Sequence, residues 1–151
     1  MATSRGIRRQ IVRNRRYVMA MATYWTLGAD AADPAALAAF WAAALNYTPE
    51  PADEDAVCVT IVDPDRTGPT IDFMRVPEPK TSKNRFHIDI RVAGEPPWDW
   101  NERANLIRAT VDRLVQDGAS KVREEIYNNK DGDVLGHIVM LDPEGNEFCV
   151  A

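Results

Sequence analysis

The same order of secondary-structure elements occurs twice along this chain, which restricts the folds that it can adopt. Each half is predicted as a strand, a helix and three further strands. A matching turn stands near the end of each half, Val62-Asp63-Pro64-Asp65 in the first and Leu141-Asp142-Pro143-Glu144 in the second. Two βαβββ modules, at about residues 23–76 and 85–151, therefore explain the whole of residues 23–151.

Both predicted helices carry recognisable end signals. Asp33 suits the N-cap of the first helix and Pro34 its first position, where the missing N–H costs nothing. Asn46 closes that helix, because asparagine tolerates the left-handed conformation found at helix ends. Asp99 or Asn101 can cap the second helix. The apolar stripes that predict the core faces are Leu37, Phe40, Trp41 and Leu45 in the first helix and Leu106, Ile107, Val111, Leu114 and Val115 in the second.

Residues 86–92 alternate apolar and polar side chains, which predicts a half-buried strand that opens the second module. The side chains expected to face the core are Phe86, Ile88, Ile90 and Val92, and those expected to face the other way are His87, Asp89 and Arg91. Two sheets of this kind, each covered by its helix on one face, can curl toward each other. The predicted fold is α+β, with the uncovered faces of both sheets lining a shared groove.

Alternation along the strands selects the side chains on the face opposite each helix. Matching the two turns by Gly68 and Gly145 makes Asp72 and Cys149 equivalent positions in the two final strands. Imidazole, carboxylate and thiolate groups are ligands of zinc and similar divalent metals, and such a metal could polarise a carbonyl while a carboxylate moves a proton. The predicted groove-lining residues are Thr26, Asp72, His87, Asp89, Glu147 and Cys149.

Other polar and aromatic residues are predicted to be structural. Cys149 resembles a small buried apolar residue more than a nucleophile, because no basic partner that would lower its pKa is identifiable. His137 lies in mid-strand, and Lys83-Asn84-Arg85 is expected to fasten the linker between the modules to the acidic domain. Trp98 and Trp100 either roof a pocket for a flat ligand or act as hydrophobic anchors, and both interpretations stay open.

Charge is unevenly distributed along the chain. Residues 1–22 hold six arginines and no acidic residue, which leaves 12 of the 18 basic residues against all 23 acidic ones in residues 23–151, a net charge of −11. Such an acidic domain repels phosphate, so we expect no nucleic-acid partner. The basic arm of residues 1–22 has three interpretations: an arm that binds nucleic acid or an acidic surface, a transit peptide, or a disordered or upstream-extended start. The last is favoured, because nothing in the arm has a packed-core pattern.

Length and cysteine content limit the class of protein. A chain of 151 residues suits one domain. The two cysteines, Cys58 and Cys149, allow at most one disulfide, which points to a reducing cytoplasm. No apolar run approaches the ~20 residues that span a bilayer, so no membrane helix is expected.

Several motifs occur together with the βαβββ repeat. They are Ala32-Asp33-Pro34 before Phe40-Trp41, Val76-Pro77-Glu78-Pro79-Lys80, Lys83-Asn84-Arg85 before His87-Ile88-Asp89, and the closing Asp142-Pro143-Glu144-Gly145-Asn146-Glu147-Phe148-Cys149. In combination they resemble the glyoxalase/bleomycin-resistance/dioxygenase (vicinal oxygen chelate) superfamily, most closely its small glyoxalase-like domain branch common in actinobacteria. The resemblance implies a homodimer and the fold predicted above. Members of the superfamily include metal-dependent lyases, isomerases and ring-cleaving dioxygenases, and also metal-free proteins that sequester antibiotics.

The resemblance also implies where a metal would bind, because the superfamily carries its ligands on the first and last strand of each module. His87 and Asp72 match two of these positions. Cys149 stands where a glutamate is usual, with Glu147 two residues earlier on the same face, and Thr26, a poor ligand, replaces histidine or glutamine. The implied ligands are therefore His87, Asp72 and Cys149, for either no metal or a single divalent ion of zinc, nickel, manganese or iron.

Three functions are consistent with this sequence, of which the last, a regulatory or interaction module, draws only on the basic arm of residues 1–22. The first is a small-molecule binding protein, free or nearly free of metal, whose groove holds a natural product or metabolite for resistance or sequestration. The second is a metal-dependent lyase or isomerase of the glyoxalase type. Specificity in such a fold lies in loops and groove side chains, so the ligand and the presence of catalysis stay open.

Overall fold

The structure is a computed structural model, and it describes residues 23–130 and 132–151. The basic arm, with its three interpretations, therefore lies outside the described residues. None of the described helices combines the length and apolar character needed to cross a bilayer.

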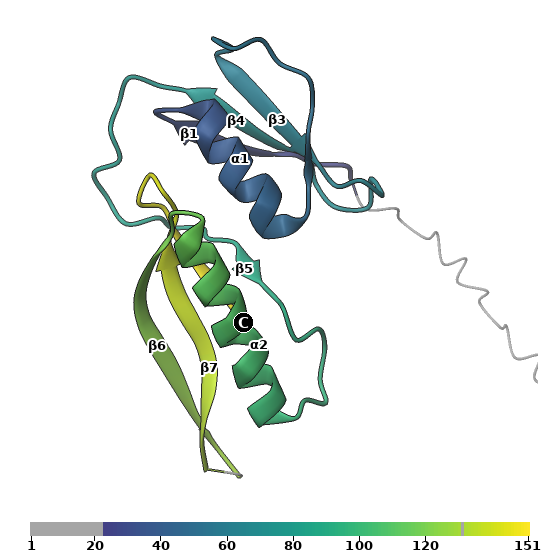
Figure 1. Cartoon of the computed structure of the whole chain (residues 1–151), viewed down its shortest axis with the longest axis vertical. Coiled ribbons are helices and arrows are strands. Elements are labelled where there is room, and N and C mark those ends of the chain that lie inside the picture. Colours follow the sequence, from purple (N-terminus) through teal and green to yellow (C-terminus); the bar gives the residue numbers. More distant parts are fainter. Residues whose placement is uncertain (1–22, 131) are drawn as a thin grey trace, which may run out of the picture.

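The described elements form two successive βαβββ modules (Figure 1), as the sequence repeat predicted. In Figure 1 the first module lies above the second, and each helix crosses one face of its own sheet. The first module consists of β1 (Leu27–Ala31), α1 (Pro34–Leu45), β2 (Thr48–Pro49), β3 (Cys58–Val62) and β4 (Ile71–Arg75). The second consists of β5 (Asp89–Ile90), α2 (Trp100–Gln116), β6 (Ser120–Asn129), β7 (Gly132–Leu141) and β8 (Glu147–Val150).

The two sheets have the same strand order, β1-β4-β3-β2 in the first module and β5-β8-β7-β6 in the second. The first and last strands of each module pair in parallel, and the other pairs are antiparallel. Gly28 pairs with Asp72 and Asp89 with Cys149, so the two modules also share their register. Among the described residues the sheets do not close on each other, because β1 and β5 are both edge strands.

The helix ends follow the predicted signals. The Asp33 side chain accepts a hydrogen bond from the Ala36 backbone N–H at 3.1 Å, and Asn46 ends α1 with φ 56° and ψ 36°. Asp99 caps α2 by accepting from the backbone N–H groups of Asn101 and Glu102, both at 2.9 Å. Asp99, rather than Asn101, is therefore the cap of the second helix.

The apolar stripe of α2 is narrower than predicted. Ile107, Val111 and Leu114 are buried, as expected. Leu106 and Val115 are 43% and 46% exposed, so their assignment to the core was wrong. Each stands next in sequence to a buried residue and is turned about 100° from it around the helix. The contact with sheet β5-β8-β7-β6 therefore covers only the central row of the stripe.

The core is continuous across the two modules, because α1 of the first packs against β8 of the second. The rings of Trp41 and Phe148 meet edge to face at 5.1 Å between centroids, and those of Phe40 and Phe148 at 6.0 Å. The Glu144 carboxylate accepts hydrogen bonds from the backbone N–H groups of Ala32 and Asp33, both at 2.8 Å. The turn before β8 thus binds the chain that enters α1.

The strand that opens the second module is shorter than predicted. Only Asp89–Ile90 forms β5, since β8 is its partner and their ladder begins at the pair Asp89–Cys149. Ile88, Ile90 and Val92 pack against the core as expected. Phe86 is 92% exposed, so its prediction as a core residue was wrong. The alternation continues beyond the ladder in the sequence, but no strand holds that end of the segment against the core.

Candidate functional site

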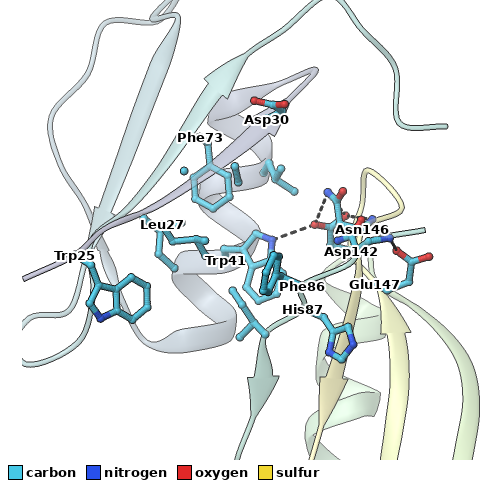
Figure 2. A pocket seen from close by; sticks show the side chains of 16 residues that line it. Trp25, Leu27, Asp30, Trp41, Phe73, Phe86, His87, Asp142, Asn146 and Glu147 are labelled. Carbon is cyan, nitrogen blue, oxygen red and sulfur yellow. Dashed lines mark hydrogen bonds between the residues drawn. The ribbon is translucent and has the colours of Figure 1, made fainter. Parts of the chain in front are cut away.

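A cavity of about 600 Å³ lies between the modules, where β1 faces the segment that leads into β5. Its walls come from β1, α1, β4, residues 84–88 and the turn before β8. The volume is within the range of pockets that hold small molecules. Figure 2 shows Trp25, Leu27, Trp41 and Phe86 across one part of the cavity and His87, Asp142, Asn146 and Glu147 across the other.

The floor of the cavity is apolar. Leu37 and Trp41 of α1 and Ile71 and Phe73 of β4 line it, and all four are buried. They also belong to the hydrophobic core, so the cavity is a margin of the core that opens between the modules. Leu37 and Trp41 were predicted to lie in the core alone. A residue that packs on one side and lines a cavity on the other has the same periodic pattern, so the sequence holds no signal for this second role.

Two large aromatic side chains stand exposed beside the cavity. Trp25 is 61% exposed and Phe86 92% exposed, and both line it. In the sequence, Trp25, Leu27 and Ala29 share one face of the segment 24–30, which predicts that all three pack on the core. Leu27 and Ala29 do pack against the core, and the prediction was wrong for Trp25. Exposed aromatic groups next to an apolar cavity are typical of binding sites, because a ligand can cover them.

Asp142 is buried at the boundary of the cavity and satisfies several donors at once. It accepts from the indole Nε1–H of Trp41 at 3.1 Å and from the backbone N–H groups of Glu144 and Asn146 at 3.0 and 2.9 Å. The Asn146 side-chain amide donates to the same carboxylate. Asp142 is therefore a structural residue that positions Trp41, a role that its place in the predicted turn did not reveal.

Glu147, a predicted groove residue, lines the cavity but is occupied by the linker between the modules. Its carboxylate accepts from the backbone N–H of Asn84 at 2.9 Å and pairs with the Lys80 ammonium at 3.1 Å. The hydrogen bond from Asn84 and the ammonium of Lys80 lower the pKa of Glu147 to about 2. Its side chain thus anchors the linker, as was predicted for the cluster Lys83-Asn84-Arg85.

Three predicted groove residues come together next to the cavity. The ligand atoms of His87, Asp89 and Cys149 lie within 4.8 Å of one another. Nδ1 of His87 is 3.3 Å from Oδ1 of Asp89, and Asp89 pairs with Cys149 across the β5–β8 ladder. His87 also lines the cavity, so the trio and the cavity share one residue.

Cys149 is a protonated, unreactive thiol in this setting. It is 6% exposed, and burial, followed by the charge and the hydrogen bond of Asp89, raises its pKa to about 11. A thiol with this pKa is almost entirely protonated at neutral pH. The prediction that Cys149 is a buried apolar residue and not a nucleophile agrees with this environment.

The other two predicted metal positions lie on the first module and are outside this trio. Asp72 of β4 accepts a hydrogen bond from the hydroxyl of Thr60 at 2.7 Å and pairs with Gly28. Thr26 is exposed just before β1. The predicted meeting of Asp72 with His87 required the two sheets to face each other closely. Because the sheets stay open, Asp89 and not Asp72 supplies the carboxylate that lies beside His87 and Cys149.

The two tryptophans before α2 do not line the cavity. Trp98 and Trp100 meet edge to face at 5.4 Å, and the guanidinium of Arg103 lies 4.9 and 5.4 Å from their rings. Arg103 donates to the carbonyl of Leu135 at 2.7 Å, beyond the point where β8 stops pairing with β7. The tryptophan rings therefore act as anchors for the Arg103 guanidinium, which donates a hydrogen bond to a β7 carbonyl beyond the β7–β8 ladder. His137 is structural as predicted, since its Nδ1 is 2.9 Å from the Tyr127 hydroxyl.

The family model described as the glyoxalase-like domain matches residues 26–151, nearly all of the described chain. This chain belongs to the glyoxalase-like domain family. No curated protein matches the glyoxalase-like chain in sequence.

Solved structures share the glyoxalase-like fold at low sequence identity. A glyoxalase/bleomycin resistance protein/dioxygenase family enzyme from Burkholderia phytofirmans is 16% identical, with a TM-score of 0.59, over 83% of this chain and 94% of its own. A mutant of the fosfomycin resistance protein FosX from Listeria monocytogenes, complexed with Mn(II) and 1S,2S-dihydroxypropylphosphonic acid, is 12% identical, with a TM-score of 0.59, over 87% and 90% of the two chains. The oxidase ChaP-H2 is 14% identical, with a TM-score of 0.53, over 87% and 93%.

The donor atoms of the trio in this glyoxalase-like domain suit a divalent ion of the zinc type. His87, Asp89 and Cys149 supply imidazole, carboxylate and, after loss of the thiol proton, thiolate. Three protein ligands leave a coordination position for water or a bound molecule. Because His87 also lines the cavity, an ion held by these three residues would lie at the cavity's edge.

Proposed function

We propose that this protein binds a small natural product or metabolite with a flat apolar part in the cavity between its modules. The cavity of about 600 Å³, with exposed Trp25 and Phe86 beside a buried apolar floor, is the observation that supports this proposal. The FosX complex gives one example of a protein of this fold with a small molecule. Sequestration of a toxic compound is the form of binding that needs no catalysis.

The apolar and polar side chains around the cavity have different roles in ligand binding. Leu37, Trp41 and Phe73 form a buried apolar floor, and the rings of Trp25 and Phe86 can cover a flat ligand from the open side. His87 is the polar group best placed to orient the ligand, because Asp89 occupies its Nδ1 and leaves Nε2 for a hydrogen bond.

Ligand screening with a matched pair of variants tests this proposal. Flat aromatic compounds that bind should quench tryptophan fluorescence and raise the melting temperature. In Phe86→Ala their affinity should fall by roughly fivefold, the effect of losing about 1 kcal/mol of aromatic contact. The folded stability should change little, because Phe86 packs on almost nothing.

Val57→Ala is the matched control, since Val57 is exposed and lies outside the cavity wall. It should bind the same compounds as the unchanged protein does. An equal loss of affinity in both variants, or an affinity that does not change in Phe86→Ala, would place the binding site elsewhere.

A metal-dependent lyase or isomerase is the second candidate, and the trio of His87, Asp89 and Cys149 supports it. A divalent ion would supply a Lewis acid that polarises a carbonyl group of the substrate. In this candidate the cavity orients the substrate beside His87, and its apolar floor excludes water.

Metal analysis of protein purified without a histidine tag separates the two candidates. Stoichiometric zinc, nickel, manganese or iron that is lost in both His87→Ala and Asp89→Asn supports the lyase or isomerase. Asp72→Asn is the control, because Asp72 lies outside the trio. Protein without metal, whose melting temperature added metal does not raise, would leave only the binding protein. The homodimer and the cytoplasmic location stay predictions from the sequence.

A further inference from the structure

Two strand edges that no described strand covers border the same cavity. Within the described residues, β1 ends one sheet and β5 ends the other. Four consecutive residues, from Leu27 to Asp30, form the cavity wall along β1. Residues 86–88, directly before β5, form the wall across from it. The cavity is therefore a slot between two open sheet edges as well as an apolar pocket.

The hydrogen-bond ladder shows which backbone groups point into the slot. Leu27 donates to Thr70 at 2.9 Å, and Ala31 accepts from Val76 at 3.0 Å, so residues 27, 29 and 31 direct their backbone groups toward β4. Alternate residues of a strand point to opposite sides. The N–H and C=O groups of Gly28 and Asp30 consequently point to the open edge, away from β4.

The opposite edge follows the same rule. Ile88 and Ile90 accept backbone hydrogen bonds from Cys149 and Ala151, at 2.9 and 2.8 Å. The backbone groups of His87 and Asp89, which alternate with them, therefore point away from β8. Both borders of the slot thus offer backbone donors and acceptors in the spacing of a β-strand.

We propose that the ligand of this cavity is peptide-like: an extended molecule whose secondary amides pair with Gly28 and Asp30 and whose apolar side group lies on the floor. Adding a strand to an open edge is a recurrent way to bind peptides, with amides supplying affinity and side-chain pockets supplying specificity. This inference rests on the proposed function, because it names the class of ligand for the same cavity.

The side-chain positions agree with such a ligand. Side groups of an added strand would alternate, one toward Leu37 and Phe73 and the next toward the opposite face. On that opposite face Gly28 has no side chain, and a Cβ built on it would meet nothing within 4 Å. A second side group can therefore lie over Gly28 without a clash.

Charge favours a basic group at one end of the ligand. A second hollow continues from Asp30 and Asn146 and is lined by Glu78, Glu144 and Lys80. Lys80 is already paired with Glu147, and Glu144 binds backbone N–H groups. The Asp30 carboxylate has no such partner among the described residues, so an ammonium or guanidinium of the ligand would be attracted to this end.

A blocked tripeptide, acetyl-alanyl-phenylalanyl-lysine amide, tests the proposal on the full chain. NMR titration should show saturable shifts of the Gly28 and Asp30 amide resonances. The same peptide with methylated amide nitrogens should bind roughly thirtyfold more weakly, the effect of losing two hydrogen bonds of about 1 kcal/mol each. Replacing its lysine by norleucine should weaken binding by about two- to fivefold in the unchanged protein and have no effect in Asp30→Asn.

A proline variant gives a second, independent measurement. Gly28→Pro removes the N–H that points to the open edge and leaves the ladder to β4 intact, the position at which an edge strand tolerates proline. Peptide affinity should fall roughly fivefold, the effect of losing one hydrogen bond, while binding of 2-naphthol, which has no amide, should persist. If this variant does not fold, the affinity of the methylated peptide for the unchanged protein still tests the proposal.

Four results would overturn the proposal. Equal binding of the methylated peptide would mean that only the apolar floor holds ligands. Binding of 2-naphthol but not of the peptide would refute the peptide class and keep the proposed function, whereas binding of neither would refute both. A dimer in solution whose Gly28 amide is protected from hydrogen exchange without peptide would show that a second copy of the chain covers this edge.

Discussion

The indole Nε1–H of Trp41 donates to the carboxylate of Asp142 at 3.1 Å, although the two residues lie 101 positions apart in the chain. This bond joins the helix of the first module to the turn before the last strand of the second. Both residues line the cavity, so the contact that unites the modules also sets the shape of the candidate site.

Replacing Asp142 should therefore loosen the whole molecule. Asp142→Ala leaves the buried indole donor of Trp41 and the turn amides of Glu144 and Asn146 without their acceptor. Removing one partner of a buried network typically costs about 2–4 kcal/mol of the free energy of unfolding. Denaturant titration followed by tryptophan fluorescence measures the loss.

The equivalent residue of the first module is the control for this prediction. Among the described residues, the Asp63 carboxylate bonds only to its own turn, at Asp65, Thr67 and Gly68. Asp63→Ala should therefore cost less stability than Asp142→Ala. An equal loss from the two replacements would mean that the bond between the modules adds nothing beyond turn formation.

The attachment of the linker at Glu147 should depend on pH. The pKa of Glu147 is lowered from 4.5 to about 2, so its ionised form stabilises the fold above pH 4.5. This contribution should fade as the pH falls from about 4.5 to about 2, where the carboxylate takes up a proton in the folded state. Unfolding curves of the unchanged protein and Glu147→Gln should differ most near neutral pH and converge toward pH 2. A difference that does not change with pH would contradict the ionic attachment.

Position 136 of β7 has room only for glycine, because the ring of Tyr127 on β6 lies against it. A Cβ at this position would lie 2.5–2.6 Å from the Tyr127 ring, so Gly136→Ala must displace the ring and its 2.9 Å contact with His137. We expect a loss of about 1–3 kcal/mol in the free energy of unfolding. Gly28→Ala is the matched control, because its new methyl group meets nothing within 4 Å. Calorimetry of the two variants should separate them clearly, and equal melting temperatures would refute the steric argument.

The fold was predictable because its signals are local and occur twice. Asp33, Pro34 and Asn46 mark the ends of α1 within the helix itself, and the turn repeat aligns the two modules without any contact between them. The shared register of Asp72 and Cys149 agrees with that alignment. The prediction that Phe86 lies in the core was wrong because the alternation of apolar and polar residues extends beyond the paired residues of β5. The alternation does not show where the hydrogen-bond ladder begins.

The site was predictable only within one module. His87, Asp89 and Cys149 lie on neighbouring strands, so alternation and strand pairing bring them together. The expected meeting with Asp72 depended on how the two sheets are placed relative to each other. That placement follows from Trp41, Asp142 and Glu144, whose contacts span more than a hundred residues and have no periodic pattern. The cavity arises from the same placement.

The trio also makes a prediction about proton release. Because burial and Asp89 raise the pKa of Cys149 to about 11, a metal that binds through its sulfur must displace a proton. Zinc affinity should therefore rise by about tenfold per pH unit between pH 7 and pH 9, with proton uptake by the buffer detectable in calorimetry. Without metal, alkylation at pH 8 should modify half-buried Cys58 before Cys149, as mass spectrometry can measure. Rapid alkylation of Cys149, or zinc affinity that does not change with pH, would show that the thiol is not the protonated, buried group described above.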